Sequence, residues 1–261
     1  LRAGVLMNRG LPQWREKMKR RRKLVVPPST EELLVDMNPE QVEVIKHHLG
    51  PLVVGAVAGA GKTAALVRRI AYLVLHHDVD PARILAVTFS KKAAGEMNDR
   101  LALFLPSASD ARVGTFHSLT YQFKREELPH MNRWDVDNRD QYRICVKDAI
   151  SFRGMNWVGA DLTQIMTYIA LCKSRCALPN TPRAKEVATE FWTKQPCGQR
   201  DPDLLVDAYN RAEVIRVDRE LITFDDMLLE MWFKLNEDER CRARWSSRWD
   251  FVMQDESQDE N

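Results

Sequence analysis

Eight consecutive residues have the composition of a phosphate-binding loop: Ala56-Val57-Ala58-Gly59-Ala60-Gly61-Lys62-Thr63. Glycines at 59 and 61 allow backbone N–H groups to wrap phosphate oxygens, and the start of a following helix adds the positive end of its dipole. In such a loop Lys62 reaches the β- and γ-phosphates of a nucleoside triphosphate, and the Thr63 hydroxyl binds Mg²⁺. Ala56 stands where the general pattern has its first glycine. A glycine-rich turn between a strand and a helix is therefore the alternative interpretation.

A second group of chemically capable residues is acidic and follows a short apolar run. Asp255 and Glu256 come directly after Phe251–Gln254, which has the character of a strand. A carboxylate at the carboxyl end of a buried strand beside the phosphate loop suits the second protein anchor of Mg²⁺, and we predict this role for Asp255. Glu256 is then the base that orients and deprotonates the attacking water. An acidic tail without a catalytic role is the alternative.

Alternating helix and strand signals surround the phosphate loop. Asn38-Pro39-Glu40-Gln41 has the pattern of a capped helix start, with proline in the first turn and glutamine at the third position. The elements predicted next are a strand at 52–57, a helix from Lys62 to about His77, a strand at 84–88, a helix from Ser90 through Leu103 and a strand at 113–115. This order predicts an α/β fold with a parallel sheet and helices on its faces.

The pattern changes after residue 118. Residues 119–221 have helical periodicity and many charges, which predicts an inserted all-helical subdomain, and strand character returns only at Phe251–Gln254. We therefore predict a first α/β segment at 30–118, the insertion at 119–221 and a return segment at 222–261. Residues 1–29 contain the basic run Lys19–Lys23 and are predicted to form an arm or linker.

Composition sets wide limits on function. With 261 residues, of which 44% are hydrophobic, the chain can bury a substantial core. The net charge of +2 gives no general argument for nucleic-acid binding, so any such argument must rest on local sites. Five widely spread cysteines are typical of a reduced, cytoplasmic protein. The longest apolar stretch is too short to cross a bilayer, so we expect no membrane association.

Metal binding by cysteine or histidine is not favoured. Cys172 and Cys176 stand four residues apart and would make half of a zinc site, but no second Cys/His pair at ligand spacing accompanies them. His47-His48 and His76-His77 are adjacent pairs, and neighbouring side chains on a helix diverge by about 100°. We interpret these histidines as helix-surface residues.

Six segments in a fixed order make the chain resemble the UvrD/Rep type of superfamily 1 helicases. They are Gln41, the phosphate loop, residues 88–97 (Thr-Phe-Ser-Lys-Lys-Ala-Ala-Gly-Glu-Met), residues 114–118 (Gly-Thr-Phe-His-Ser), Phe224-Asp225-Asp226 and Asp255-Glu256-x-Gln258-Asp259. The resemblance covers residues 38–261, includes the position of the insertion and extends to a stretch around Lys173 and Pro179. It implies a RecA-like P-loop NTPase domain that uses ATP and Mg²⁺.

The resemblance assigns further nucleotide contacts. Gln41 matches the glutamine that reads the adenine edge, a role compatible with its place in the helix cap. Gln258 lies in the segment that matches the family's second ATPase motif, beside the ATP. Lys91 stands where the family often has Asn, and Gln254 where an apolar residue usually precedes the Asp, but neither departure removes a catalytic group.

The resemblance also implies contacts with single-stranded DNA. Thr88, Phe89 and Lys91 match a segment that lies along the strand, with Phe89 as a base-stacking platform; a core position for Phe89 is the alternative. Thr115 and His117 match a second strand-contacting segment, although a lone histidine is more often structural. The Phe224-Asp225-Asp226 segment matches a helix start and is interpreted as structural.

The whole protein implied by the resemblance is a 3′-to-5′ DNA translocase and helicase that acts on single strands and duplex junctions. A second motor domain, which completes the ATP site with arginines and forms the opposite wall of the DNA channel, is missing from this chain. We therefore expect the chain alone to be inactive. The alternatives are the helicase part of a helicase–nuclease and a nucleotide-binding regulatory or defence module that does not unwind DNA.

Overall fold

The computed structural model describes residues 28–57, 59–105, 111–137, 140–151, 162–194 and 201–255. They form two compact units. The first contains the described residues up to Phe116 and from Arg244 onward, and the second contains those from His117 to Ala243. Helix α11 therefore belongs to the second unit, and α12 contains the boundary.

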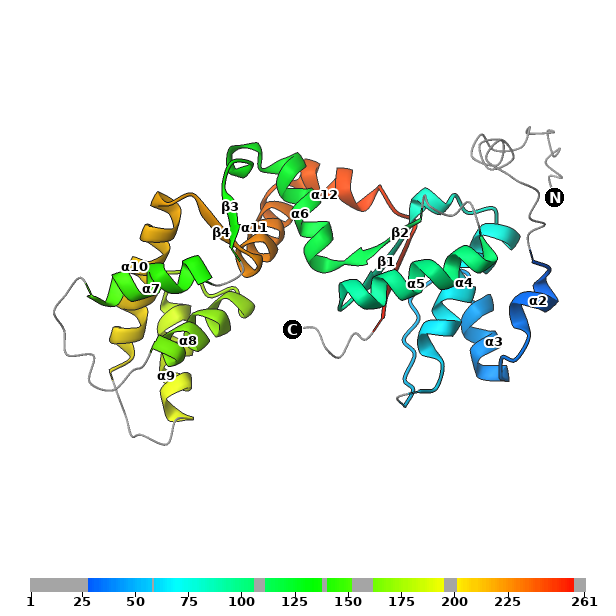
Figure 1. Cartoon of the computed structure of the whole chain (residues 1–261), viewed down its shortest axis with the longest axis horizontal. Helices are drawn as coiled ribbons and strands as arrows, with labels where there is room; N and C mark the ends of the chain where they lie inside the picture. Colours follow the sequence, from blue (N-terminus) through cyan, green and yellow to red (C-terminus); the bar gives the residue numbers. More distant parts are fainter. Residues whose placement is uncertain are drawn as a thin grey trace, which may run out of the picture. The chain divides into compact units, whose positions relative to one another are not determined.

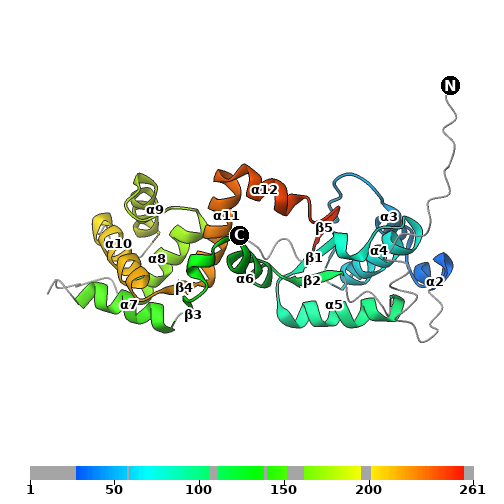
Figure 2. The ribbon, with the colours of Figure 1, turned by 90° about the horizontal axis from the view of Figure 1, so that it is seen from above.

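The first unit is built on a three-stranded parallel sheet. Its order is β2 (Arg112–Thr115), β1 (Ile84–Thr88), β5 (Phe251–Gln254). Its helices are α2 (Thr30–Leu34), α3 (Pro39–Lys46), α4 (Lys62–His76) and α5 (Lys91–Phe104), with a 3₁₀ turn at Pro81–Arg83. Figures 1 and 2 show α5 running alongside β1 and β2; α4 packs on α5, and α2 and α3 pack on α4. The predicted α/β class and parallel sheet are confirmed.

Local sequence signals fix where these helices begin. Asn38 accepts a hydrogen bond from the Gln41 N–H at 2.8 Å, and Gln41 Oε1 accepts one from the Asn38 N–H at 2.9 Å, which completes a capping box. Ser90 caps α5 through the Ala93 N–H at 3.1 Å. The core that these helices cover is aliphatic: Ile70, Leu73, Ile84 and Met97 are fully buried.

The strand predicted at 52–57 is absent, so that prediction was wrong. Residues 51–57 have no regular structure and are exposed, with Val53 at 95%. An apolar run satisfies the composition of a buried strand, but a strand also needs a hydrogen-bonded neighbour. Among the described residues the sheet ends at β5, and no strand pairs with this segment.

The second unit is mainly helical. It contains α6 (Phe116–Glu127) from its second residue on, α7 (Asp140–Ser151), α8 (Leu162–Ser174), α9 (Pro182–Thr193), α10 (Pro202–Asp218) and α11 (Phe224–Glu237), a 3₁₀ turn at Pro129–Met131, and the first part of α12 (Glu239–Ser246). Figure 1 shows α7 to α10 gathered into one group. Their shared core includes Tyr168 and Tyr209, both fully buried, and the Tyr168 hydroxyl donates to the Ala184 carbonyl at 2.9 Å.

The predicted insertion is not wholly helical, which corrects the sequence interpretation. Strand β3 (Asp135–Asp137) pairs in parallel with β4 (Leu221–Thr223). The Asp-Val-Asp sequence of β3 has little strand propensity, so its conformation comes from pairing with the buried Leu-Ile-Thr of β4. None of the described helices is long and apolar enough to cross a membrane.

Candidate nucleotide-binding site

The predicted phosphate loop has backbone conformations that suit glycine. Gly59 and Gly61 both have φ of +80°. A Cβ added at Gly61 would lie 2.7 Å from Nε2 of Gln41, so a side chain there would displace the Gln41 amide. Gly61 is followed directly by α4, whose first turn has no side-chain cap. Ala58 lies outside the described residues.

Gln41 links helix α3 to the phosphate loop. Its Nε2 donates to the Ala60 carbonyl at 2.8 Å, while its Oε1 takes part in the capping box of α3. The same amide therefore serves the helix start and the loop. Contact with adenine remains a prediction for this residue.

The two predicted Mg²⁺ anchors lie together. The Thr63 hydroxyl donates to Oδ2 of Asp255 at 2.8 Å, although the two residues are 192 positions apart in the sequence. Asp255 is only 7% exposed, and its N–H donates to the Val87 carbonyl at 2.9 Å, which extends the β1–β5 ladder by one residue. A hydroxyl and a carboxylate oxygen at this distance match the oxygen ligands that Mg²⁺ prefers. Glu256 and Gln258 lie outside the described residues.

A cavity of about 1180 Å³ adjoins these groups. It is bounded by α3, the segment leading into the phosphate loop, the start of α4 and β5, and its lining includes Gln41, Ala56, Lys62 and Asp255. Lys62 Nζ lies 3.4 Å from the Ala56 carbonyl, so its side chain follows the loop. A pocket of this size is large enough for a nucleotide.

An ion pair and a backbone hydrogen bond join the residues that precede β1 and β5. The Arg83 Nε donates to Oδ2 of Asp250 at 3.0 Å, and the Asp250 N–H donates to the Arg83 carbonyl at 2.8 Å. The hydrogen bond from the Arg83 guanidinium, with its charge, lowers the pKa of Asp250. Both residues directly precede their strands, so the pair lies at the start of the register that continues to Asp255.

The residues predicted to contact DNA fall into both units. Thr88 and Thr115 pair in register where β1 and β2 end, and both are buried. The Phe89 ring is 61% exposed, so it is not a core residue, and Lys91 is exposed in the first turn of α5. His117 is exposed in the second unit.

Phe224 is a candidate that the sequence interpretation missed. Its side chain is 40% exposed, and its ring lies edge-on to the His117 ring with 5.1 Å between centroids. Other aromatic side chains are exposed as well, such as Tyr121 at 46% and Trp232 at 48%, so exposure alone does not single out Phe224; its ring contact with His117, a residue predicted to contact DNA, makes it a candidate. Its sequence signal was its place in the Phe224-Asp225-Asp226 segment, which we matched to a helix start and interpreted as structural.

A cluster of histidines lies behind the Gln41 helix. The His48 and His77 rings are stacked at 3.7 Å, and His48 lines the cavity. Arg69 of α4 donates to the Val44 carbonyl at 2.9 Å and to the His47 carbonyl, which ties the end of α3 to α4. Among the described residues, no group of three or more potential metal ligands is present.

This stack predicts a pH-dependent stability. Desolvation by neighbouring groups, followed by the charges of His48, His76 and Arg69, lowers the pKa of the exposed His77 below its ordinary value of 6.5. The unfolded chain therefore takes up this proton more readily, and stability is lost as the pH falls below about 6.5. We expect the difference in thermal unfolding midpoint between pH 7.5 and 5.5 to be smaller for His77→Asn than for the wild type. An unchanged difference would contradict the role of the stack, and His130→Asn is the matched control.

Comparisons with known proteins identify the family of the chain. Residues 37–261 match the family described as UvrD/REP helicase N-terminal domain. The chain is 29% identical over 235 residues to the ATP-dependent DNA helicase PcrA of Bacillus subtilis (strain 168), covering 88% of this chain and 30% of that protein. It is 29% identical over 241 residues to a probable DNA helicase II homolog of Rickettsia felis, covering 89% and 35%.

A probable DNA helicase II homolog of Rickettsia conorii is 30% identical over 233 residues, covering 86% of this chain and 34% of the relative. The chain thus spans about a third of the length of the curated relatives it matches. The matched range contains Ala56–Thr63, residues 119–221 and Asp255. The chain belongs to the UvrD/REP helicase N-terminal domain family.

Proposed function

We propose that the chain is the ATP-binding part of an ATP-dependent DNA helicase that translocates 3′ to 5′ along single-stranded DNA. The observation that carries this proposal is the contact between Thr63 and Asp255 at 2.8 Å, beside a cavity that Gln41 and Lys62 also line. A RecA-like P-loop site needs a hydroxyl, a carboxylate and a lysine in this proximity. The names of the relatives support ATP and DNA as the substrates.

Each residue of the site is assigned a separate role in ATP hydrolysis. Backbone N–H groups of the phosphate loop and Lys62 hold the phosphates, and Gln41 contacts the base. Mg²⁺, when held by Thr63 and Asp255, neutralises phosphate charge. Glu256 accepts a proton from the attacking water as the bond between the γ-phosphorus and its bridging oxygen breaks and ADP leaves.

DNA is proposed to run past the carboxyl ends of β1 and β2. Phe89 and Lys91 follow β1. Thr115 is the last residue of β2, and His117 comes two residues later. The exposed ring of Phe89 in the first unit is suited to base stacking, which tolerates any sequence, and the exposed ring of Phe224 in the second unit is suited to it independently. Because Thr88 and Thr115 are buried, we assign them to holding the backbone of these segments in place.

A second motor domain is proposed to complete the site. Phosphoryl transfer of this kind needs a cationic finger that stabilises the transition state and contributes about 10³–10⁵ in rate. In the resembling helicases it comes from the second motor domain. We infer that residues 1–261 alone hydrolyse ATP slowly. Separately, we propose that the whole protein is cytoplasmic.

The test is strand displacement by the full-length protein. With ATP and Mg²⁺ it should unwind a duplex that carries a 3′ single-stranded tail, leave blunt and 5′-tailed duplexes intact, and stop when a non-hydrolysable ATP analogue is supplied. Residues 1–261 alone should displace no strand. DNA-stimulated ATP hydrolysis without displacement of any substrate would favour a non-unwinding module, and DNA cleavage would favour a helicase–nuclease.

A further inference from the structure

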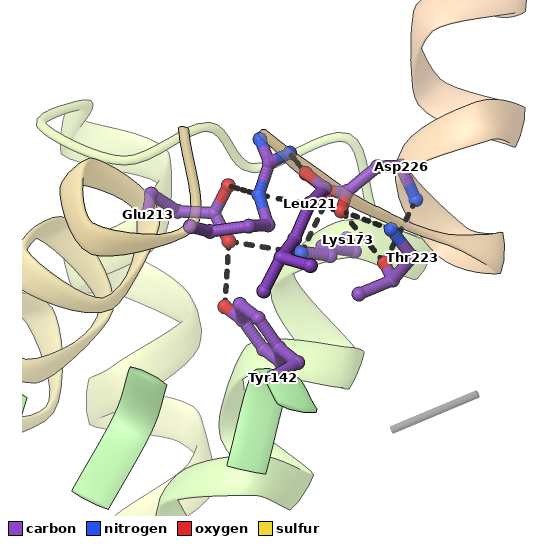
Figure 3. Close-up of polar contacts among 7 residues, drawn as sticks. Tyr142, Lys173, Glu213, Leu221, Thr223 and Asp226 are labelled. Atoms are coloured by element: carbon purple, nitrogen blue, oxygen red, sulfur yellow. Dashed lines mark hydrogen bonds and ion pairs between the residues drawn. The ribbon is translucent and has the colours of Figure 1, made fainter. Parts of the chain in front are cut away.

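Lys173 is buried between two carboxylates inside the second unit. Its Nζ lies 2.9 Å from Oε1 of Glu213 on α10 and 2.7 Å from Oδ1 of Asp226 on α11, and its side chain is 1% exposed. Figure 3 shows the ammonium between the two acids, with the Tyr142 ring below it. The Tyr142 hydroxyl donates to Glu213 at 2.5 Å. One lysine therefore connects α8 with α10 and α11.

A second cation makes the cluster neutral. Arg216 Nε lies 2.8 Å from Glu213 and 3.4 Å from Asp226, and Arg216 Nη1 donates to the Leu221 carbonyl at 2.7 Å. Two cations thus face two carboxylates. Desolvation offsets most of the attraction in such a cluster, and apolar side chains of the same volume would often be as stable. Stability alone is therefore a weak reason for burying four charges here.

Asp226 divides its two oxygens between this cluster and a helix start. Its Oδ2 accepts hydrogen bonds from the Thr223 N–H at 2.9 Å and the Thr223 hydroxyl at 2.7 Å, while Oδ1 faces Lys173. Burial opposes ionisation of Asp226, but the charges of Lys173 and Arg216 and the bonds from Lys173 and Thr223 leave its pKa below the ordinary value. The carboxylate therefore stays ionised at neutral pH.

The helix start that Asp226 caps carries an exposed ring. Phe224 is the first residue of α11, and its ring meets the His117 ring edge-on. A shift of the Thr223–Asp226 cap would rotate the first turn of α11 and move Phe224 away from His117. The buried charges are thus connected to the surface through a single turn of helix.

We propose that Lys173 is a positioning residue for single-stranded DNA, which acts through Asp226 to hold Phe224 against His117. The proposal rests on the proposed function, because it assumes that these two rings contact the strand. Lys173 itself is too deeply buried to touch DNA.

The experiment compares Lys173→Met with Arg175→Met in the full-length protein. Arg175 directly follows α8, and its ion pair with Glu190 reaches α9 rather than α11. We expect Lys173→Met to weaken binding of a fluorescent single-stranded oligonucleotide about 10-fold, within the range expected for one lost base–aromatic contact. ATP turnover at saturating DNA should stay within about twofold, and Arg175→Met should bind as the wild type does.

A double-mutant cycle with Phe224→Ala separates positioning from general loosening. If Lys173 acts through Phe224, Lys173→Met adds little to the loss already caused by Phe224→Ala. Should Lys173→Met fail to fold because it leaves an unbalanced buried carboxylate, Lys173→Met combined with Glu213→Gln keeps the cluster neutral while removing the contact with Asp226. Circular dichroism and the unfolding midpoint monitor folding of each variant.

Several results would overturn the proposal. Unchanged DNA affinity in the folded Lys173 variants, an equal loss in Arg175→Met, or full additivity with Phe224→Ala would each show that the cluster does not position the ring. Wild-type affinity of Phe224→Ala would show that Phe224 makes no DNA contact. If the wild-type protein itself binds no single-stranded DNA, the proposed function fails together with this inference.

Discussion

Lys62→Ala is expected to abolish ATP hydrolysis by the full-length protein. Lys62 begins α4, and among the described residues of the phosphate loop it supplies the cationic side chain that can balance the γ-phosphate charge. The loss should be about 10³-fold or more, comparable to that of another cation that stabilises phosphoryl transfer. Turnover of ATP with and without single-stranded DNA measures it.

Lys92→Ala is the matched control for this substitution. Lys92 is on α5, its side chain is 88% exposed, and its ion pair with Glu96 at 4.0 Å is a surface contact of little energetic value. The Lys92→Ala substitution removes the same positive charge as Lys62→Ala and should leave ATP turnover nearly unchanged. Normal DNA-stimulated hydrolysis by Lys62→Ala would disprove the phosphate-loop assignment, whatever the control shows.

Glu256→Gln should separate the base from the metal anchor. The substitution removes the proton acceptor but keeps the side-chain volume, so turnover should fall by roughly 10²–10⁴, the usual contribution of a positioned general base. Binding of Mg²⁺ and ATP should remain nearly intact. A fluorescent nucleotide measures binding, and single-turnover hydrolysis measures the chemical step.

Asp255→Asn provides the comparison for Glu256→Gln. Asp255 contacts the Thr63 hydroxyl, so its loss should raise the Mg²⁺ concentration that half-maximal turnover needs. If Glu256→Gln instead lost nucleotide binding while turnover for each bound ATP stayed unchanged, the roles assigned to Asp255 and Glu256 would be exchanged.

The parts of the fold that depend on local chemistry could be predicted from the sequence. The cap of α3 at Asn38 and that of α5 at Ser90 need only neighbouring residues, and both are present as expected. Strands β1 and β5 were recognisable because both are short apolar or β-branched runs followed by polar residues. The proximity of Thr63 and Asp255 agrees with the shared Mg²⁺ site predicted for them, although the strand predicted before Thr63 is absent and only Asp255 follows a strand.

Features that depend on distant partners could not be predicted in this way. Residues 52–57 are as apolar as β1, yet without a neighbouring strand they remain irregular and exposed. Asp135–Asp137 has the opposite character, and it is a strand because β4 lies beside it. The Lys173 cluster draws on four helices, and no spacing rule relates Tyr142, Glu213 and Asp226 in one dimension.

The 192 positions between Thr63 and Asp255 affect how the protein is made. During synthesis at about 5–20 residues per second, Asp255 leaves the ribosome roughly 10–40 s after Thr63. The second unit has a core of its own between Tyr142 and Leu221, so its helices can collapse in that interval. Until β5 is synthesised, one edge of β1 has no partner strand, and such an edge can pair with a wrong strand. The contact between Thr63 and Asp255 can therefore form in the nascent chain only after β5 has emerged.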